Sequence, residues 1–107
     1  MIKPVKSLGL DDSHQIWRTA MKKRGEDIRA AVVARLRTGR EDQGLSNRQL
    51  SIRSGLSRAT IRNIESGTQS PSLETLIMLA EGLGANLPDM IHEETAKRKR
   101  QQNPSAE

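Results

Sequence analysis

Residues 46–67 hold two short helical patterns on either side of a glycine, and this spacing constrains the fold more than any other part of the chain. Ser46, with Gln49 three positions later, forms a capping box and predicts the start of a helix. Gly55 can adopt the left-handed backbone conformation that ends a helix. Ser57 then predicts the start of a second helix. The segment is therefore expected to form two helices joined by a tight turn.

The second of these helices has two sides of different chemistry. Ile61 and Ile64 lie three positions apart and predict a buried side. The other side holds Arg58, Ala59, Arg62 and Asn63. Arg can bond guanine and Asn can bond adenine as bidentate pairs in the major groove, and a small Ala allows close approach to a thymine methyl group. The pattern is that of a helix-turn-helix, and its outward side suits DNA.

Charge of one sign gathers on this motif. Within residues 46–70 the single acidic residue is Glu65, and the basic residues are Arg48, Arg53, Arg58 and Arg62. An ordinary solvated basic face is the alternative for the second helix taken alone. The concentration of arginines over the whole motif favours an anionic partner. The net charge of +5 agrees with this, but it does not separate DNA from RNA or a membrane surface.

The segment from Ile28 to Ile91 resembles the phage-repressor (Cro-like, XRE-type) helix-turn-helix family of transcription regulators. The resemblance rests on five short pieces in order: GLS at 44–46, SGLSRATI at 54–61, IESG at 64–67, SPSLETL at 70–76 and LAxxLG at 79–84. It implies an all-α fold, a five-helix repressor-like DNA-binding domain. In this chain an N-terminal helical extension precedes that domain.

The resemblance also implies which residues contact DNA. The base-reading positions of the family correspond to Arg58, Ala59 and Asn63. The phosphate-binding position after the first cap corresponds to Asn47, where many members have Gln. The other implied contacts to the DNA backbone are Arg48, Ser57, Thr60, Arg62, Thr68, Gln69 and Ser70, the last three being in the turn whose backbone amides meet the sugar-phosphate chain. Such contacts fix register without reading sequence.

Three further expectations come from the same resemblance. The family commonly has a basic residue and a Glu at the positions of Arg40 and Glu65, so a partly buried ion pair is expected, with a surface contact between Glu65 and Arg62 as the alternative. Gly39 replaces a usual Leu, which predicts a locally weak helix. Ser51 replaces a usual Ala, and its hydroxyl can bond a carbonyl one turn back.

The chain is expected to have three parts: an arm and extension helix at 1–27, the helix-turn-helix domain at 28–92 and a basic, disordered tail at 93–107. Gly25 is expected to interrupt the helix between the first two parts. A short fifth helix is expected at 88–92. The helix after Ser72 is expected to bury its apolar residues, namely Leu73, Leu76, Ile77, Leu79, Ala80 and Leu83.

The extension helix, residues 13–24, has an apolar side. We expect the protein itself to cover this side across a two-fold dimer interface, because a small core gains most from a shared apolar surface. The residues concerned are Ile16, Trp17, Ala20 and Met21. Two basic runs, at 22–24 and 97–100, could extend the contact with phosphates, and the second could serve nuclear import in a eukaryote. A solvated charge run is the favoured interpretation of each.

These features predict a dimeric, sequence-specific transcription regulator that binds a double-stranded DNA operator as a repressor, reading the major groove with helix 57–66. An autoregulating antitoxin that also binds a toxin protein is one alternative, and a protein-interaction module that has lost DNA binding is another. No enzyme activity is expected, because no carboxylate pair, activated nucleophile or phosphate loop is present.

Neither a cofactor nor a metal is expected either, because His14 and His92 stand apart from any group of ligands. The chain has no cysteine, no apolar run of membrane-spanning length and no signal-peptide pattern at its start. We therefore expect a cytoplasmic protein without a membrane partner.

Overall fold

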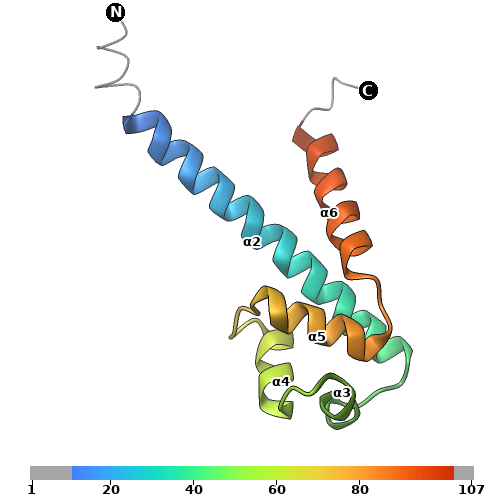
Figure 1. Cartoon of the computed structure of the whole chain (residues 1–107). Coiled ribbons are helices and arrows are strands. Elements are labelled where there is room, and N and C mark those ends of the chain that lie inside the picture. The colour runs from blue at the N-terminus through green and yellow to red at the C-terminus, as the bar shows by residue number, and fades with distance from the viewer. Residues whose placement is uncertain (1–10, 103–107) are drawn as a thin grey trace, which may run out of the picture.

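A computed structural model describes residues 11–102 (Figure 1). The helices of this part are α2 (Asp11–Asp42), α3 (Asn47–Ser54), α4 (Arg58–Ser66), α5 (Leu73–Leu83) and α6 (Leu87–Gln102). Within the described residues there is no strand, so the expected all-α, five-helix fold is confirmed. No helix of this part is long and apolar enough to cross a membrane.

Three serines begin the central helices. The side chains of Ser46, Ser57 and Ser72 each accept a hydrogen bond from a backbone amide three residues ahead. At Ser46 the capping box is complete, because the Gln49 side chain accepts the Ser46 amide at 2.8 Å. Glycines with positive φ end α3 and α4, at 83° for Gly55 and 85° for Gly67. The helix starts predicted at the three serines are therefore confirmed.

The core lies between the C-terminal half of α2 and helices α3, α4 and α5, and Leu87 at the start of α6 closes it. Its buried residues are Val32, Leu36, Leu45, Leu50, Ile61, Ile64, Leu76, Leu79, Ala80, Leu83 and Leu87. Two residues of α5 do not join them, because Leu73 is 62% exposed and Ile77 is 43% exposed. The expected burial of these two residues is wrong. They lie on the side of α5 that lines a groove beside α6.

Helix α2 is longer than expected, because it passes through Gly25 without a break. One glycine inside a helix costs about 1 kcal/mol relative to alanine, and good helix formers flank it here. The predicted interruption is wrong, and the boundary expected between residues 27 and 28 falls inside one helix. Gly39 does not interrupt α2 either, and a methyl group added there would lie 3.9 Å from Cδ1 of Leu83.

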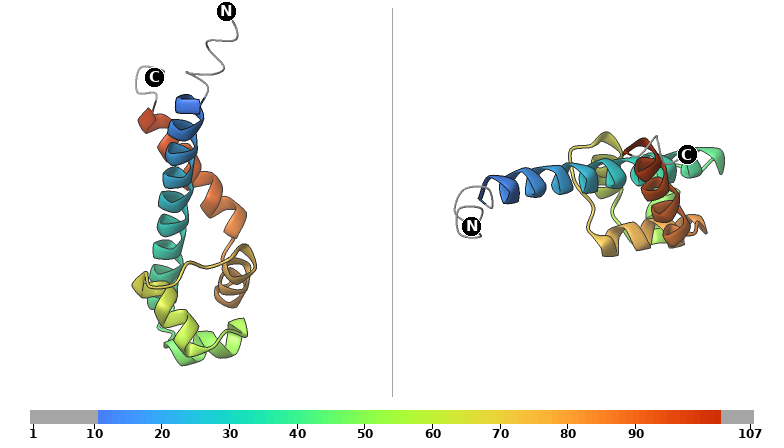
Figure 2. Two further views of the ribbon diagram at one scale, coloured as in Figure 1. Left: turned by 90° about the vertical axis from the view of Figure 1, so that its left-hand side faces the viewer. Right: turned by 90° about the horizontal axis from the view of Figure 1, so that it is seen from above.

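The N-terminal half of α2 projects from the bundle as an arm (Figures 1 and 2). Its apolar side is open to solvent in the single chain, with Ile16 exposed by 68% and Trp17 by 63%. Within residues 11–102, therefore, no part of the chain covers these two side chains. Cover by a second copy stays a prediction.

Helix α6 is also longer than expected. The short helix predicted at 88–92 continues to Gln102, so the predicted disorder of residues 93–102 is wrong. Residues 103–107, the rest of the predicted tail, and the arm at 1–10 lie outside the described residues. One buried side chain of α6 anchors this added length to α2.

That anchor is Glu94, whose side chain is only 5% exposed. Nη1 of Arg98 donates to its Oε1 at 2.8 Å, and Nζ of Lys97 donates to Oε2 at 3.3 Å. Arg35 of α2 reaches both Glu94, at 3.5 Å, and the neighbouring Glu93, at 2.7 Å. A buried carboxylate is tolerated when opposite charges and hydrogen bonds surround it, as they do here.

The acid stability of the fold is expected to depend on Glu94. Burial acts to raise the pKa of Glu94, but hydrogen bonds from Arg98 and Lys97, with their charges, outweigh it and hold the pKa below its ordinary value. A carboxyl with a lowered pKa in the folded state stabilises above its unfolded pKa and loses that contribution as the pH falls through the folded pKa.

We expect Glu94→Gln to cost about 1–3 kcal/mol of unfolding free energy at pH 7 and less at pH 3. Urea unfolding of the wild type and the variant at both pH values measures the difference. Glu93→Gln is the matched control, because Glu93 forms an exposed pair and is expected to cost under about 1 kcal/mol. An equal loss for Glu94→Gln at pH 3 and pH 7 would contradict the assignment.

Candidate nucleic-acid interface

Helices α3 and α4 form the end of the described part that lies farthest from the N-terminal end of α2 and the C-terminal end of α6 (Figures 1 and 2). Because α6 leads away from α4, the basic run at 97–100 lies at the other end of the molecule. The run at 22–24 lies on the projecting half of α2. Neither run is beside the two helices that carry the predicted DNA contacts.

Helix α4 buries one side and exposes the other. Ile61 and Ile64 are buried in the core, as the sequence predicts. The opposite side is exposed and contains Arg58, Ala59, Arg62 and Asn63. The residues expected to read bases therefore share one outward face of a helix that its core contacts hold in place.

The start of α4 depends on two hydroxyl groups that are also expected DNA contacts. Oγ of Ser57 accepts the backbone amide of Thr60 at 3.0 Å and donates to Oγ1 of Thr60 at 2.8 Å. The proton of Ser57 is thus used within the cap. The hydroxyl proton of Thr60 remains available to a phosphate.

A polar cleft of about 450 Å³ lies where the end of α2, the start of α3 and α4 meet. It brings Asn47, the expected phosphate contact of α3, beside Arg62 and Asn63 of α4. The complete lining is Arg37, Arg40, Asn47, Arg62, Asn63, Glu65 and Ser66. Two of the expected classes of contact, to the DNA backbone and to bases, therefore border one hollow.

The arginines of the helix-turn-helix carry uncompensated charge. No residue of the described part of the chain forms a hydrogen bond or an ion pair with the side chains of Arg48, Arg53, Arg58 or Arg62. Three arginines of α2, in contrast, form ion pairs: Arg35 with Glu93, Arg37 with Glu41 and Arg40 with Glu65. Both α3 and α4 thus carry unpaired positive charge that is available to an anionic partner.

In the turn after α4, two of the backbone amides that the resemblance assigns to DNA are hydrogen-bonded within the chain. The amides of Thr68 and Gln69 both donate to the carbonyl oxygen of Asn63, at 2.9 and 3.1 Å. The hydroxyl of Thr68 donates to the same oxygen at 3.2 Å, and Oγ of Ser70 accepts a hydrogen bond from Arg29 at 3.3 Å. These amides cap the C-terminus of α4, so contacts to DNA from this turn would use exposed side chains such as that of Gln69.

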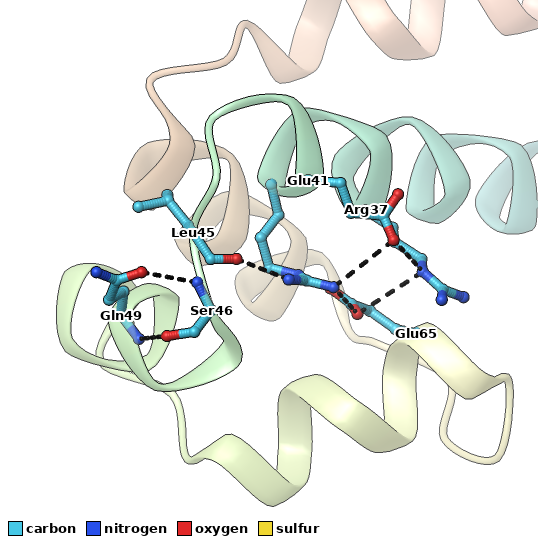
Figure 3. Close-up of polar contacts among 7 residues, drawn as sticks. Arg37, Glu41, Leu45, Ser46, Gln49 and Glu65 are labelled. Atoms are coloured by element: carbon cyan, nitrogen blue, oxygen red, sulfur yellow. Dashed lines mark hydrogen bonds and ion pairs between the residues drawn. The ribbon is translucent and has the colours of Figure 1, made fainter.

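The ion pair expected between Arg40 and Glu65 is present (Figure 3). Nε and Nη2 of Arg40 donate to the two carboxylate oxygens of Glu65 at 2.8 and 2.9 Å, and each side chain is 13% exposed. Nη1 of Arg40 also donates to the carbonyl of Leu45 at 2.7 Å. The hydrogen bond to Glu65 raises the pKa of Arg40, although burial acts to lower it. One guanidinium thus joins α2, the segment before α3 and the end of α4.

Two serines of α3 hold the turn between α3 and α4 through hydrogen bonds that the sequence did not predict. The hydroxyl of Ser51 donates to the carbonyl of Leu56, five residues ahead, so the bond expected one turn back does not form. Oγ of Ser54, which is buried, accepts the amide of Leu56 at 3.2 Å. Serines of α3 therefore bond both the amide and the carbonyl of Leu56, and these bonds fix the angle between α3 and α4. The sequence signal for these bonds is the presence of two serines in the last turn of the helix before Gly55.

Comparisons with known proteins agree with this geometry. The family described as helix-turn-helix matches residues 36–90, which contain all of α3, α4 and α5. An uncharacterized HTH-type transcriptional regulator of Haemophilus influenzae is 39% identical over 64 residues, covering 60% of this chain and 65% of the relative. The uncharacterized HTH-type transcriptional regulator y4dL of Sinorhizobium fredii is 44% identical over 52 residues, covering 49% and 26%.

Another relative is matched over more of its own length. The control protein C.SmaI of Serratia marcescens is 34% identical over 65 residues, which cover 61% of this chain and 77% of that protein. The chain covers less than two thirds of the length of the Haemophilus and Sinorhizobium relatives named above. No solved structure matches the chain significantly. The chain belongs to the XRE-type helix-turn-helix family of DNA-binding transcriptional regulators.

Proposed function

We propose that this protein is a dimeric repressor that recognises its operator by placing α4 in the major groove. The observation that carries the proposal is the outward side of α4, where Arg58, Ala59 and Asn63 are all exposed. A major groove admits one α-helix, and these side chains match guanine, a thymine methyl group and adenine in turn. The side chains of Arg58 and Asn63 have no partner within the described residues, so both are available for bases.

Binding strength and orientation would come from the phosphates on either side. The proposed phosphate contacts are Asn47 and Arg48 at the start of α3, Thr60 and Arg62 on α4, and Gln69 in the following turn. Asn47 and Arg62 border the same cleft as Asn63. Neutralising phosphates releases counterions, so this part of the affinity is independent of sequence and falls with salt. The same contacts set the register in which Arg58 and Asn63 meet base edges.

The proposed dimer and the proposed repression are both compatible with this arrangement. A dimer with two-fold symmetry presents two copies of α4 to successive major grooves on one side of the duplex, about 34 Å apart. Occupying such a site within a promoter excludes other proteins from it. Repression therefore requires only that the protein bind tightly enough at the right position.

Selection of bound sequences from random duplex DNA tests this proposal. We expect an inverted repeat whose half-site centres lie about one helical turn apart, with guanine and adenine in each half-site. A reporter promoter that carries the selected site should lose expression when the protein is produced. A selected site without an inverted repeat would contradict the dimer, and a reporter whose expression rises would contradict repression.

A further inference from the structure

The turn after α4, which the family resemblance places at the sugar-phosphate chain, has no charge of its own. Its residues, 67–72, have the sequence Gly-Thr-Gln-Ser-Pro-Ser. Hydroxyl and amide side chains can bond phosphate oxygens, but a cation is needed to neutralise a phosphate and release its counterions. The turn lies beside the middle of α2 (Figures 1 and 2). A basic residue of α2 could therefore supply the charge that the turn lacks.

Arg29 of α2 reaches this turn. Its Nη2 donates to Oγ of Ser70 at 3.3 Å. Both residues line a cleft of about 570 Å³ between α2 and the turn. Hydrogen bonds and burial fix the turn, because the amides of Thr68 and Gln69 bond the end of α4 and Pro71 is buried. The guanidinium of Arg29 therefore lies against a fixed turn at the C-terminal end of α4.

Most of the donor capacity of Arg29 is unused within the described residues. A guanidinium has five N–H donors, and the bond to Ser70 is the single hydrogen bond that this one donates there. It also forms no ion pair in that part of the chain, whereas Arg35, Arg37 and Arg40 of the same helix each pair with a glutamate. Arg29 is partly buried. A partly buried cation with one neutral partner favours an anion from another molecule.

The acidic residues of the cleft leave Arg29 available. Asp27 pairs with Lys23 at 3.5 Å, and Glu65 belongs to the buried pair described above. Glu26 stands three residues before Arg29, but no ion pair joins the two side chains in the structure. A glutamate and an arginine at this spacing on a helix can approach one another. An ion pair between Glu26 and Arg29 is therefore the alternative that the test must separate.

We infer that Arg29 contacts a phosphate of the DNA backbone beyond the C-terminal end of α4. The inference rests on the proposed function, because it needs α4 in the major groove. It extends the contact surface outside residues 36–90, the part of the chain that matches the helix-turn-helix family. Arg29 is thus a positioning residue, since a phosphate contact fixes the register of α4 without reading sequence.

The salt dependence of binding tests this contact. Arg29→Gln removes the charge but keeps a polar residue with good helix propensity. We expect it to weaken binding to the operator and to random DNA alike, by roughly fivefold or more at low salt, and to lower the slope of log Kd against log salt concentration by about 0.9 for each bound subunit. Arg29→Lys should keep the slope, because it keeps the charge. A role confined to the fold would not change the slope.

Lys22→Gln is the matched control. Lys22 lies seven residues before Arg29, two turns along the same side of α2 and about 10 Å farther from the turn. It carries the same charge, and its side chain forms no hydrogen bond or ion pair within residues 11–102. Its substitution should change Kd by less than about twofold. Urea unfolding of both variants shows whether either substitution disturbs the fold.

Operators with single neutral phosphates locate the contact. A methylphosphonate replaces one charged oxygen of a phosphate with a methyl group, and a set of operators carries it at each position in turn. At one position of each half-site we expect it to weaken wild type roughly fivefold and Arg29→Gln by less than about twofold. This coupling assigns a particular phosphate to Arg29.

The outcomes separate this inference from the proposed function. An unchanged salt slope for Arg29→Gln, a loss equal to that of Lys22→Gln, or the absence of a coupled phosphate would overturn the contact while leaving base reading by α4 intact. An unchanged slope with a lower free energy of unfolding, shared by Glu26→Gln, would assign Arg29 to an ion pair with Glu26. A protein that selects no sequence from random duplex DNA would instead overturn the proposed function.

Discussion

Glu65→Gln is expected to lower the free energy of unfolding by about 2–4 kcal/mol, and Arg40→Met by a similar amount. Losing one partner of a buried pair costs about 3–5 kcal/mol, whereas an exposed pair contributes about 0–1 kcal/mol. At 13% exposure, with two bonds between the side chains at 2.8 and 2.9 Å, this pair lies nearer the buried case. Urea unfolding monitored by circular dichroism gives both values.

A matched control shows whether the effect comes from this pair. Glu41 carries the same charge near the end of α2 but is 52% exposed where it contacts Arg37, so Glu41→Gln is expected to cost under about 1 kcal/mol. The loss in Arg40→Met should slightly exceed that in Glu65→Gln, because Arg40 also serves the carbonyl of Leu45. Losses below about 1 kcal/mol in both Arg40→Met and Glu65→Gln would mean that the pair behaves as a surface contact.

Arg58→Ala and Asn63→Ala are each expected to weaken binding to the selected operator by about 1–3 kcal/mol, or roughly 5- to 150-fold in Kd. Binding to random duplex DNA should change much less for Asn63→Ala, because its amide carries no charge. Fluorescence anisotropy titrations on both DNAs measure the ratio. The expected signature is a loss of discrimination between the two DNAs.

Two further variants separate reading from general attraction. Asn47→Ala should weaken binding to all sequences alike, since its expected partner is a phosphate. Arg100→Ala removes the same charge as Arg58→Ala but on α6, far from α4, and should leave operator binding within about twofold of wild type. If Arg58→Ala and Arg100→Ala lost operator affinity equally, the contribution of Arg58 would be general charge alone.

The helices around the proposed DNA-reading face could be predicted because their signals are local. Ser46, Ser57 and Ser72 cap their helices through amides only three residues away, and Gly55 ends α3 through its own backbone conformation. Such contacts need no knowledge of the rest of the fold. The exposure of Arg58 and Asn63 followed from the burial of the isoleucines on the other side of α4.

The predictions from sequence are wrong where the structure depends on residues far apart in the chain or on energies that oppose one another. In α6, Glu94 bonds Lys97 and Arg98 within one turn, but its burial against α2 and its contact with Arg35, 59 positions earlier, are not contained in any local pattern. The break predicted at Gly25 is wrong because the flanking helix formers outweigh a penalty of about 1 kcal/mol. The resemblance implies that the amides of Thr68 and Gln69 bind phosphates, whereas in the structure both donate to the carbonyl of Asn63 at the end of α4.

The central claim, that Arg58 reads a guanine from the major groove, is tested most directly by changing one atom of the DNA. Replacing a guanine of the selected half-site with 7-deazaguanine removes N7, one of the two acceptors that a bidentate arginine uses, and leaves the base pair intact. Binding of wild type and Arg58→Ala to both operators forms a double-mutant cycle. The account predicts that the modified guanine weakens wild type about tenfold and leaves Arg58→Ala almost unchanged. Equal losses for both proteins at every guanine, or no loss for wild type at any of them, would contradict it.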